Sequence, residues 1–185
     1  LIAAGLKVVE TAPFYIFSTF VVSYATTTLA YEKSQALESV TLAALVATVL
    51  IPVMGLLSDK IGRKRMYAVS VMLLGAFIVP WFMLLNTGTT WGIILATVIT
   101  FGILWSPITA VLGTLCSEIF SANVRYTGIT LGYQIGAALA GGTAPLIATG
   151  LLAKYDGDWV PVAWYLGTTV AISLTAIFFA SRSKR

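Results

Sequence analysis

The segment GLLSDKIGRKR, from Gly55 to Arg65, separates two uncharged apolar stretches that are each long enough to cross a lipid bilayer. It holds four of the chain's 11 Lys and Arg residues. A short basic turn between two spans is typical of a cytoplasmic hairpin in a polytopic membrane protein, because Lys and Arg are retained on the inner side during insertion. We therefore expect this turn to join two membrane-spanning helices on the cytoplasmic side.

The composition excludes an ordinary water-soluble domain. Hydrophobic residues make up 58% of the 185 residues, charged residues make up 10%, and the mean hydropathy is +0.94. The lipid bilayer is therefore the expected partner of most of the surface. The pI of about 9.3 has the same origin as the basic turn and does not indicate a nucleic-acid partner.

The uncharged intervals predict six transmembrane helices. About 20 apolar residues cross the hydrocarbon core, and the longest interval, 66–117, is divided by the turn-rich cluster at 86–90. The predicted fold class is an all-α membrane protein with spans near 12–31, 39–58, 66–85, 91–117, 126–152 and 159–181.

Lys and Arg residues are distributed unequally between the two predicted sides. Nine, including Lys7, lie on the side of the basic turn, and only Lys33 and Lys154 lie on the other. Both ends of this segment are therefore expected in the cytoplasm. Aromatic rings near the turns on the other side are expected at the headgroup level, with core packing as the alternative. They are those of Trp81, Trp91, Tyr155 and Trp159.

Cysteine and histidine usage excludes several kinds of site. The chain has one Cys and no His, so it offers neither an internal disulfide nor a histidine-based zinc site or catalytic triad. Cys116 is expected to be a small buried hydrophobe.

Several motifs together resemble the metabolite:proton symporters of the major facilitator superfamily, which include shikimate, α-ketoglutarate, citrate and proline/betaine carriers. The similarity runs from about residue 6 to the C-terminal end. The basic turn matches the family's loop signature at Gly55, Asp59, Lys60, Gly62, Arg63 and Lys64. Further matches are SEIF at 117–120, VRYTG at 124–128, GYQIG at 132–136, GG at 141–142 and PLIA at 145–148.

This resemblance implies the C-terminal six-helix bundle of a twelve-helix carrier, whose N-terminal half is missing from the segment. It implies a secondary transporter of the plasma (inner) membrane that moves a small metabolite by alternating access, with a proton gradient as energy source and no cofactor. Two departures are visible. The family often has Tyr-Gly-Pro where this chain has Trp105-Ser106-Pro107, and Pro-Thr where it has Ala122-Asn123. The first lies at cavity depth and leaves the substrate open.

Four charged residues are candidates for a conformational gate. Asp59 and Arg63 are four residues apart, a spacing that brings opposite charges together on a helix, and Gly62 permits a tight turn. Glu118 and Arg125 bracket the next loop on the same side. The resemblance implies that these residues lock the cytoplasmic side in the outward-open state. The alternative is that the basic residues only set the topology.

A second pattern predicts close helix packing. Small residues recur every four positions at Gly128, Gly132, Gly136, Ala140 and Ala144, which lets another helix backbone approach closely. Pro145, after two glycines, is expected to bend this helix because proline removes an intrahelical hydrogen bond.

Polar and aromatic residues at mid-membrane depth are candidates for lining a substrate cavity. Trp105 and Gln134 are favoured because each needs an external hydrogen-bond partner, whereas a Ser or Thr hydroxyl can bond to a backbone carbonyl of its own helix. The full candidate set is Tyr15, Thr19, Ser23, Trp105, Ser106, Tyr133 and Gln134.

No charged residue lies at the centre of a predicted span. Glu10 and Glu118 are expected at cytoplasmic helix ends, where they are poor candidates for carrying protons across the membrane. The proton-carrying groups are then expected in the missing half. A membrane-embedded enzyme or a non-transporting six-helix receptor are the alternatives; an enzyme would need a cluster of titratable groups, which the sequence does not show.

Overall fold

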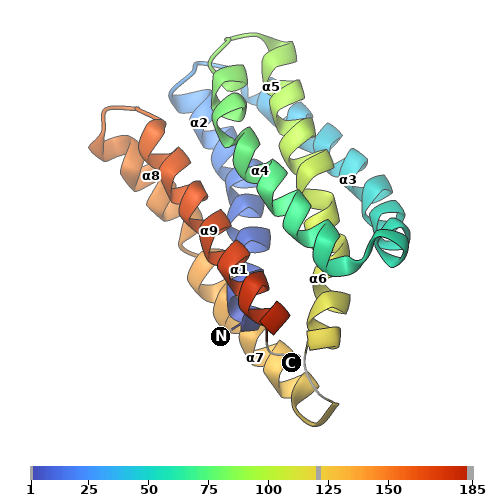
Figure 1. The fold of residues 1–185 in the computed structure, drawn as a ribbon. Helices are drawn as coiled ribbons and strands as arrows, with labels where there is room; N and C mark the ends of the chain where they lie inside the picture. Colours follow the sequence, from blue (N-terminus) through green and yellow to red (C-terminus); the bar gives the residue numbers. More distant parts are fainter. Residues whose placement is uncertain (1, 120–121, 183–185) are drawn as a thin grey trace.

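The computed structural model describes residues 2–119 and 122–182, with 122–126 and 181–182 described by their backbone alone. Within these ranges the chain forms long antiparallel helices packed side by side, as Figure 1 shows. The elements in chain order are α1 (Ile2–Tyr15), η1 (Ile16–Phe20), α2 (Val21–Thr27), α3 (Lys33–Ile61), α4 (Arg63–Leu85), α5 (Thr90–Thr97), η2 (Val98–Leu104), α6 (Trp105–Ile119), α7 (Ala122–Ala140), α8 (Ala144–Lys154) and α9 (Val160–Arg182).

Six helical stretches of the described chain are long and apolar enough to cross a membrane. They are Ile2–Thr27, Lys33–Ile61, Arg63–Leu85, Thr90–Ile119, Thr127–Lys154 and Val160–Ala180. All six overlap the predicted spans, but the first runs from Ile2 to Thr27, where the sequence predicts 12–31. Lys7 and Glu10 interrupt the uncharged interval in the sequence, yet they pair with each other in α1, so the helix continues through them.

One end of the bundle carries the turn between α3 and α4, and both described chain ends lie there too (Figure 1). We call it the basic end, after Lys60, Arg63, Lys64 and Arg65. Gly62 separates the two helices with a φ of +96°, in the left-handed region that favours glycine. The opposite end holds the loops 28–32, 86–89 and 155–159.

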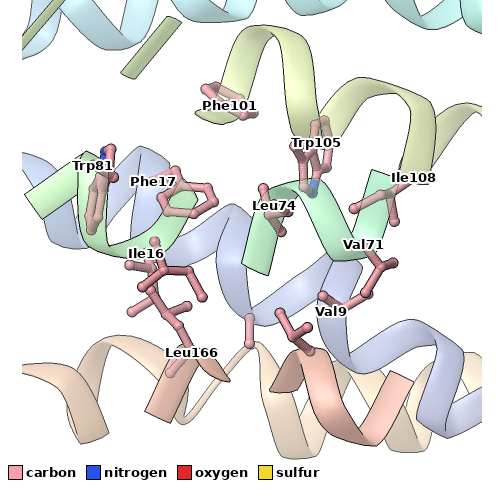
Figure 2. Packing of buried hydrophobic residues seen from close by; sticks show 14 of the residues in the cluster. Val9, Ile16, Phe17, Val71, Leu74, Trp81, Phe101, Trp105, Ile108 and Leu166 are labelled. Atoms are coloured by element: carbon pink, nitrogen blue, oxygen red, sulfur yellow. The ribbon is translucent and has the colours of Figure 1, made fainter. Parts of the chain in front are cut away.

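The centre of the bundle is packed with aromatic and branched side chains from α1, α4, α6 and α9, as Figure 2 shows. Trp81 is completely buried there, with its ring 4.9 Å from that of Phe17 in an edge-to-face arrangement. The expected headgroup position is therefore wrong for Trp81. Aromatic packing in the core accounts for its place instead.

Helix breaks occur where the sequence has glycine and proline. The chain turns at residues 141–143 between α7 and α8, and Pro145 lies in the first turn of α8, where its missing N–H costs nothing. The predicted bend is thus a turn that divides the span Thr127–Lys154 into α7 and α8.

Two spans contain π-helical turns, which the sequence did not predict. η1 follows Pro13 in α1, and η2 precedes Pro107 in α6. A π-helical turn widens the helix by one residue and is uncommon outside functional regions.

Candidate functional site

Arg63 holds two carboxylates at the basic end. Its Nη2 donates to Asp59 Oδ1 at 2.8 Å, and its Nη1 donates to Glu118 Oε1 at 2.5 Å. Because Gly62 ends α3, the contact with Asp59 forms across the turn between α3 and α4 and not along one helix. The ion triad of Asp59, Arg63 and Glu118 therefore ties together the ends of α3, α4 and α6.

The other basic residues of this end are not part of the triad. Lys60, Lys64 and Arg65 form no ion pair within the described residues. Arg125 belongs to the backbone of α7, but its side chain lies outside the described residues. Gly55 lies in α3, with nothing within 4 Å of the position where a Cβ would stand. The structure thus places three of the predicted gate residues in one contact.

The small-residue ridge of α7 lies against α1. A Cβ added to Gly132 would stand 2.5 Å from the Cβ of Ala3, and one added to Gly136 would stand 2.8 Å from the carbonyl oxygen of Ala4. Real side chains do not approach so closely, so the two backbones could not take this separation with larger residues. Ala140, at the end of α7, continues the ridge as a buried residue, and Ala144 is buried at the start of α8, whereas Gly128 is half-buried.

A serine joins α1 to α9 on another side. The Ser173 hydroxyl donates to the carbonyl oxygen of Gly5 at 2.6 Å and accepts from the backbone N–H of Val9 at 3.1 Å. It therefore inserts into the hydrogen-bond ladder of α1 and fixes the two helices together without charge.

Part of the predicted cavity set forms an exposed polar stripe. Tyr15 is 39% exposed, and Thr19 and Ser23 follow it along the same face of the first span as exposed residues. Neighbouring hydroxyls such as that of Ser18 donate to backbone carbonyls of their own helix, but those of Tyr15, Thr19 and Ser23 make no hydrogen bond within the described residues. Gln134 on α7 is likewise exposed.

The remaining members of the set are more enclosed. Ser106 is fully buried and donates to the carbonyl oxygen of Gly102 at 2.6 Å, so its hydroxyl is satisfied within its own helix. Trp105 is buried too, and its Nε1 donates to the backbone carbonyl of Glu10 at 2.7 Å. Tyr133 is half-buried, with a hydroxyl that is buried and has no hydrogen-bond partner.

Glu10 is the centre of a polar cluster that the sequence did not predict. Its Oε2 accepts from Lys7 Nζ at 2.5 Å and from the Thr11 hydroxyl at 2.8 Å, and its Oε1 accepts from Thr109 at 3.4 Å. The Lys7 ammonium also lies 5.0 Å from the centre of the Tyr133 ring, a cation–π contact. The Glu10 cluster consists of Lys7, Glu10, Thr11, Trp105, Thr109 and Tyr133.

The position of Glu10 corrects an expectation from the sequence. It lies inside the helical span Ile2–Thr27, with 13% of its side chain exposed, and not at a helix end. The sequence signal for this position of Glu10 is its spacing from Lys7, three residues away. This spacing places opposite charges on one helix face, where they can lie inside a membrane span as a pair.

The comparison with protein families agrees with the resemblance. The family model described as Major Facilitator Superfamily matches residues 6–185. No solved structure gave a significant match.

Three similar curated proteins are named as a transporter or a symporter. The chain is 28% identical to the shikimate transporter of Escherichia coli over 98% of its own length and 41% of the relative's length. It is 34% identical to the ectoine/proline transporter ProP of Corynebacterium glutamicum, over 76% of the chain and 27% of that protein. It is 25% identical to the citrate-proton symporter of Klebsiella pneumoniae, over 98% of the chain and 41% of that protein. The chain thus spans less than half the length of these relatives.

Proposed function

Because the chain belongs to the Major Facilitator Superfamily, we propose that it forms the C-terminal six-helix half of a secondary transporter that moves a small metabolite by alternating access. In this mechanism two six-helix bundles rock about a central binding site. The names of the relatives support a substrate among organic acids, shikimate-like compounds and ectoine- or proline-like compounds. The name of the citrate-proton symporter supports coupling to protons.

The observation that carries this proposal is the exposed polar stripe of Tyr15, Thr19 and Ser23. Hydroxyls without hydrogen bonds are costly against hydrocarbon, so this face fits a water-filled cavity between two halves better than it fits lipid. Gln134 would join the same cavity from α7. A receptor without a binding site between two bundles would not need an exposed polar stripe. Membership in a transporter family indicates a transporter and not an enzyme.

Uptake measurements test the proposed function directly. The complete carrier, expressed in cells that lack their own carriers for these compounds, is expected to accumulate one of labelled shikimate, proline, ectoine or citrate. A protonophore is expected to abolish the accumulation, because the proton gradient supplies the energy. Accumulation that continues in the presence of the protonophore would contradict proton coupling. If the carrier is shown to be in the membrane but takes up none of the four compounds, the proposed substrate class is contradicted.

We also propose that the basic end faces the cytoplasm of a plasma (inner) membrane. With Lys7 inside the first span, eight Lys and Arg residues flank the basic end and two flank the other end.

Thiol labelling at the two ends of α3 tests this orientation. In a Cys116→Ser background, a cysteine at exposed Ser34 is expected to react with a membrane-impermeant reagent in intact cells, whereas one at exposed Lys60 is expected to react only after the cells are opened. The opposite pattern would place the basic end outside. Both positions lie on one helix, so each serves as the control for the other.

A further inference from the structure

The Lys7–Glu10 ion pair lies inside the first membrane-length helical stretch, Ile2–Thr27, unlike the ion triad, whose residues lie at helix ends. Its side chains are 19% and 13% exposed. Charged groups inside a membrane span are costly, and they are retained mainly where they bind or move ions and substrates. A purely structural link to α1 does not need charge, because the hydroxyl of Ser173 already makes one between α1 and α9.

Both Lys7 and Glu10 can make further hydrogen bonds. Oε2 of Glu10 accepts two short hydrogen bonds, but Oε1 accepts only the long one from Thr109, at 3.4 Å. The Lys7 ammonium has three donors, and Glu10 is the only carboxylate within its reach among the described residues. The ring of Tyr133 lies against Lys7, but its hydroxyl is buried beside the thiol of Cys116 and does not reach the ammonium's open side. An incoming carboxylate would therefore find its donors on Lys7.

The surroundings of Glu10 contain few other titratable groups. Tyr67 of α4, Cys116 of α6 and Tyr133 of α7 lie close enough to interact electrostatically within this region, and all three are neutral in their ordinary forms near pH 7. α9 presents the uncharged hydroxyl of Ser173. Among the described residues, Lys7 is therefore the one charge that balances Glu10.

We propose that Glu10 is the group that takes up the coupling proton, and that Lys7 is the group that binds the carboxylate of the substrate. The two carboxylates compete for one ammonium. The proposal rests on the proposed function of a proton-coupled transporter, and it assigns residues to the coupling proton and to the carboxylate that the candidate substrates share.

The exchange balances in charge and in bonds. In the empty carrier, Lys7 and Glu10 neutralise each other. A proton that enters from the outer side forms an O–H bond on the Glu10 carboxylate, which leaves the Lys7 ammonium without a counter-ion, and the substrate carboxylate takes that place. After the substrate leaves on the inner side, Glu10 loses its proton there and pairs with Lys7 again. One proton and one carboxylate cross together.

The order of events follows from the cost of an unpaired charge in this environment. Removing Lys7 from an ionised Glu10 would leave both charges uncompensated away from bulk water, which is unfavourable. Protonation of Glu10 removes this cost, and so does a substrate carboxylate on Lys7. Substrate binding and proton uptake therefore favour each other, as coupled transport requires.

The test separates proton-driven accumulation from exchange in vesicles that contain the complete carrier and the substrate found in the uptake experiment. Glu10→Gln is expected to lose accumulation, so that the inside-to-outside ratio falls to about one, while exchange of labelled for unlabelled substrate continues and no longer depends on pH. Lys7→Gln is expected to raise the KM for exchange about tenfold or more, since a charge-assisted hydrogen bond is lost. Glu38→Gln, on the exposed face of α3, is the matched control and is expected to resemble the natural carrier.

Each other outcome has a definite meaning. The proposal is overturned if the Glu10→Gln variant accumulates substrate as well as the natural carrier does. It is also overturned if this variant is present in the membrane in normal amount but loses exchange together with accumulation. If the pair had only a structural role, the double variant Lys7→Gln with Glu10→Gln would recover accumulation, because it contains no unpaired charge. Such a recovery would also overturn the proposal. If the natural carrier itself accumulates nothing, it is the proposed function that fails.

Discussion

Replacing Gly132 with leucine is expected to abolish transport. A Cβ added at this position would stand 2.5 Å from the methyl group of Ala3, which is fixed directly to the backbone and cannot move aside as a flexible side chain would. Overpacking a close interface costs about 1–3 kcal/mol of stability, and here α1 would have to move away from α7. Since the first span carries the exposed polar stripe and α1 carries Lys7 and Glu10, a shift of this span would disturb the whole candidate site. Uptake of the identified substrate measures the effect.

A pair of alanine variants separates this contact from general effects on the helix. Alanine gains about 1 kcal/mol of helix propensity over glycine, so Gly150→Ala, with nothing within 4 Å of its Cβ position in α8, is expected to raise the thermal stability of the purified carrier. Gly132→Ala is expected to lower it despite the same gain. If both variants raise stability and transport, α7 does not approach α1 as closely as described here.

Replacing Arg63 with alanine is expected to bias the complete carrier toward the inward-open state. The change removes the common partner of Asp59 and Glu118, so the ends of α3, α4 and α6 lose their link at once. Removing one carboxylate leaves the other in place, and Asp59→Asn or Glu118→Gln should therefore have smaller effects. We expect the outside accessibility of a cavity cysteine to fall on the order of tenfold in the arginine variant, within the usual range of conformational coupling.

Arg65 provides the matched control for Arg63, because it lies in the same turn of helix and forms no ion pair within the described residues. If Arg65→Ala changes accessibility as much as Arg63→Ala does, the basic turn acts only through its charge and sets the topology. A charge exchange between Asp59 and Arg63 alone is expected to fail, because the new aspartate would face Glu118. Recovery requires a positive residue at position 118 as well.

Local signals made the helices and the basic turn predictable. The density of charge around Gly62, the turn residues at 86–90 and the glycine and proline residues at 141–145 each act over a few residues, so they are visible in the sequence. The ridge of α7 is visible for the same reason, since it repeats every four residues of one helix.

The features that the sequence did not predict depend on contacts between distant residues. Glu118 reaches Arg63 because α6 packs beside α4, so the sequence predicts Asp59, Arg63, Glu118 and Arg125 at one end, whereas only the structure shows that Arg63 binds both carboxylates. Glu10 was placed at a helix end because hydropathy treats its charge as isolated, whereas pairing with Lys7 lets α1 continue through it. Trp81 was assigned by its distance from a turn, but its environment is set by Phe17 on another helix.

The π-helical turns of η1 and η2 give two spans a point at which side chains can change the direction they face. Each turn holds one residue more than an α-helical turn of the same height, and moving that surplus residue along the helix rotates the residues between its old and new positions by about 100°, the angle between successive residues. Pro13 and Pro107 lie beside these turns, where they already interrupt the regular hydrogen bonds. A short segment of either helix can therefore turn its side chains while the rest of the helix keeps its packing. In the first span, the contacts of α7 with Ala3 and Ala4 and the bonds of Ser173 to Gly5 and Val9 keep the start of α1 in place.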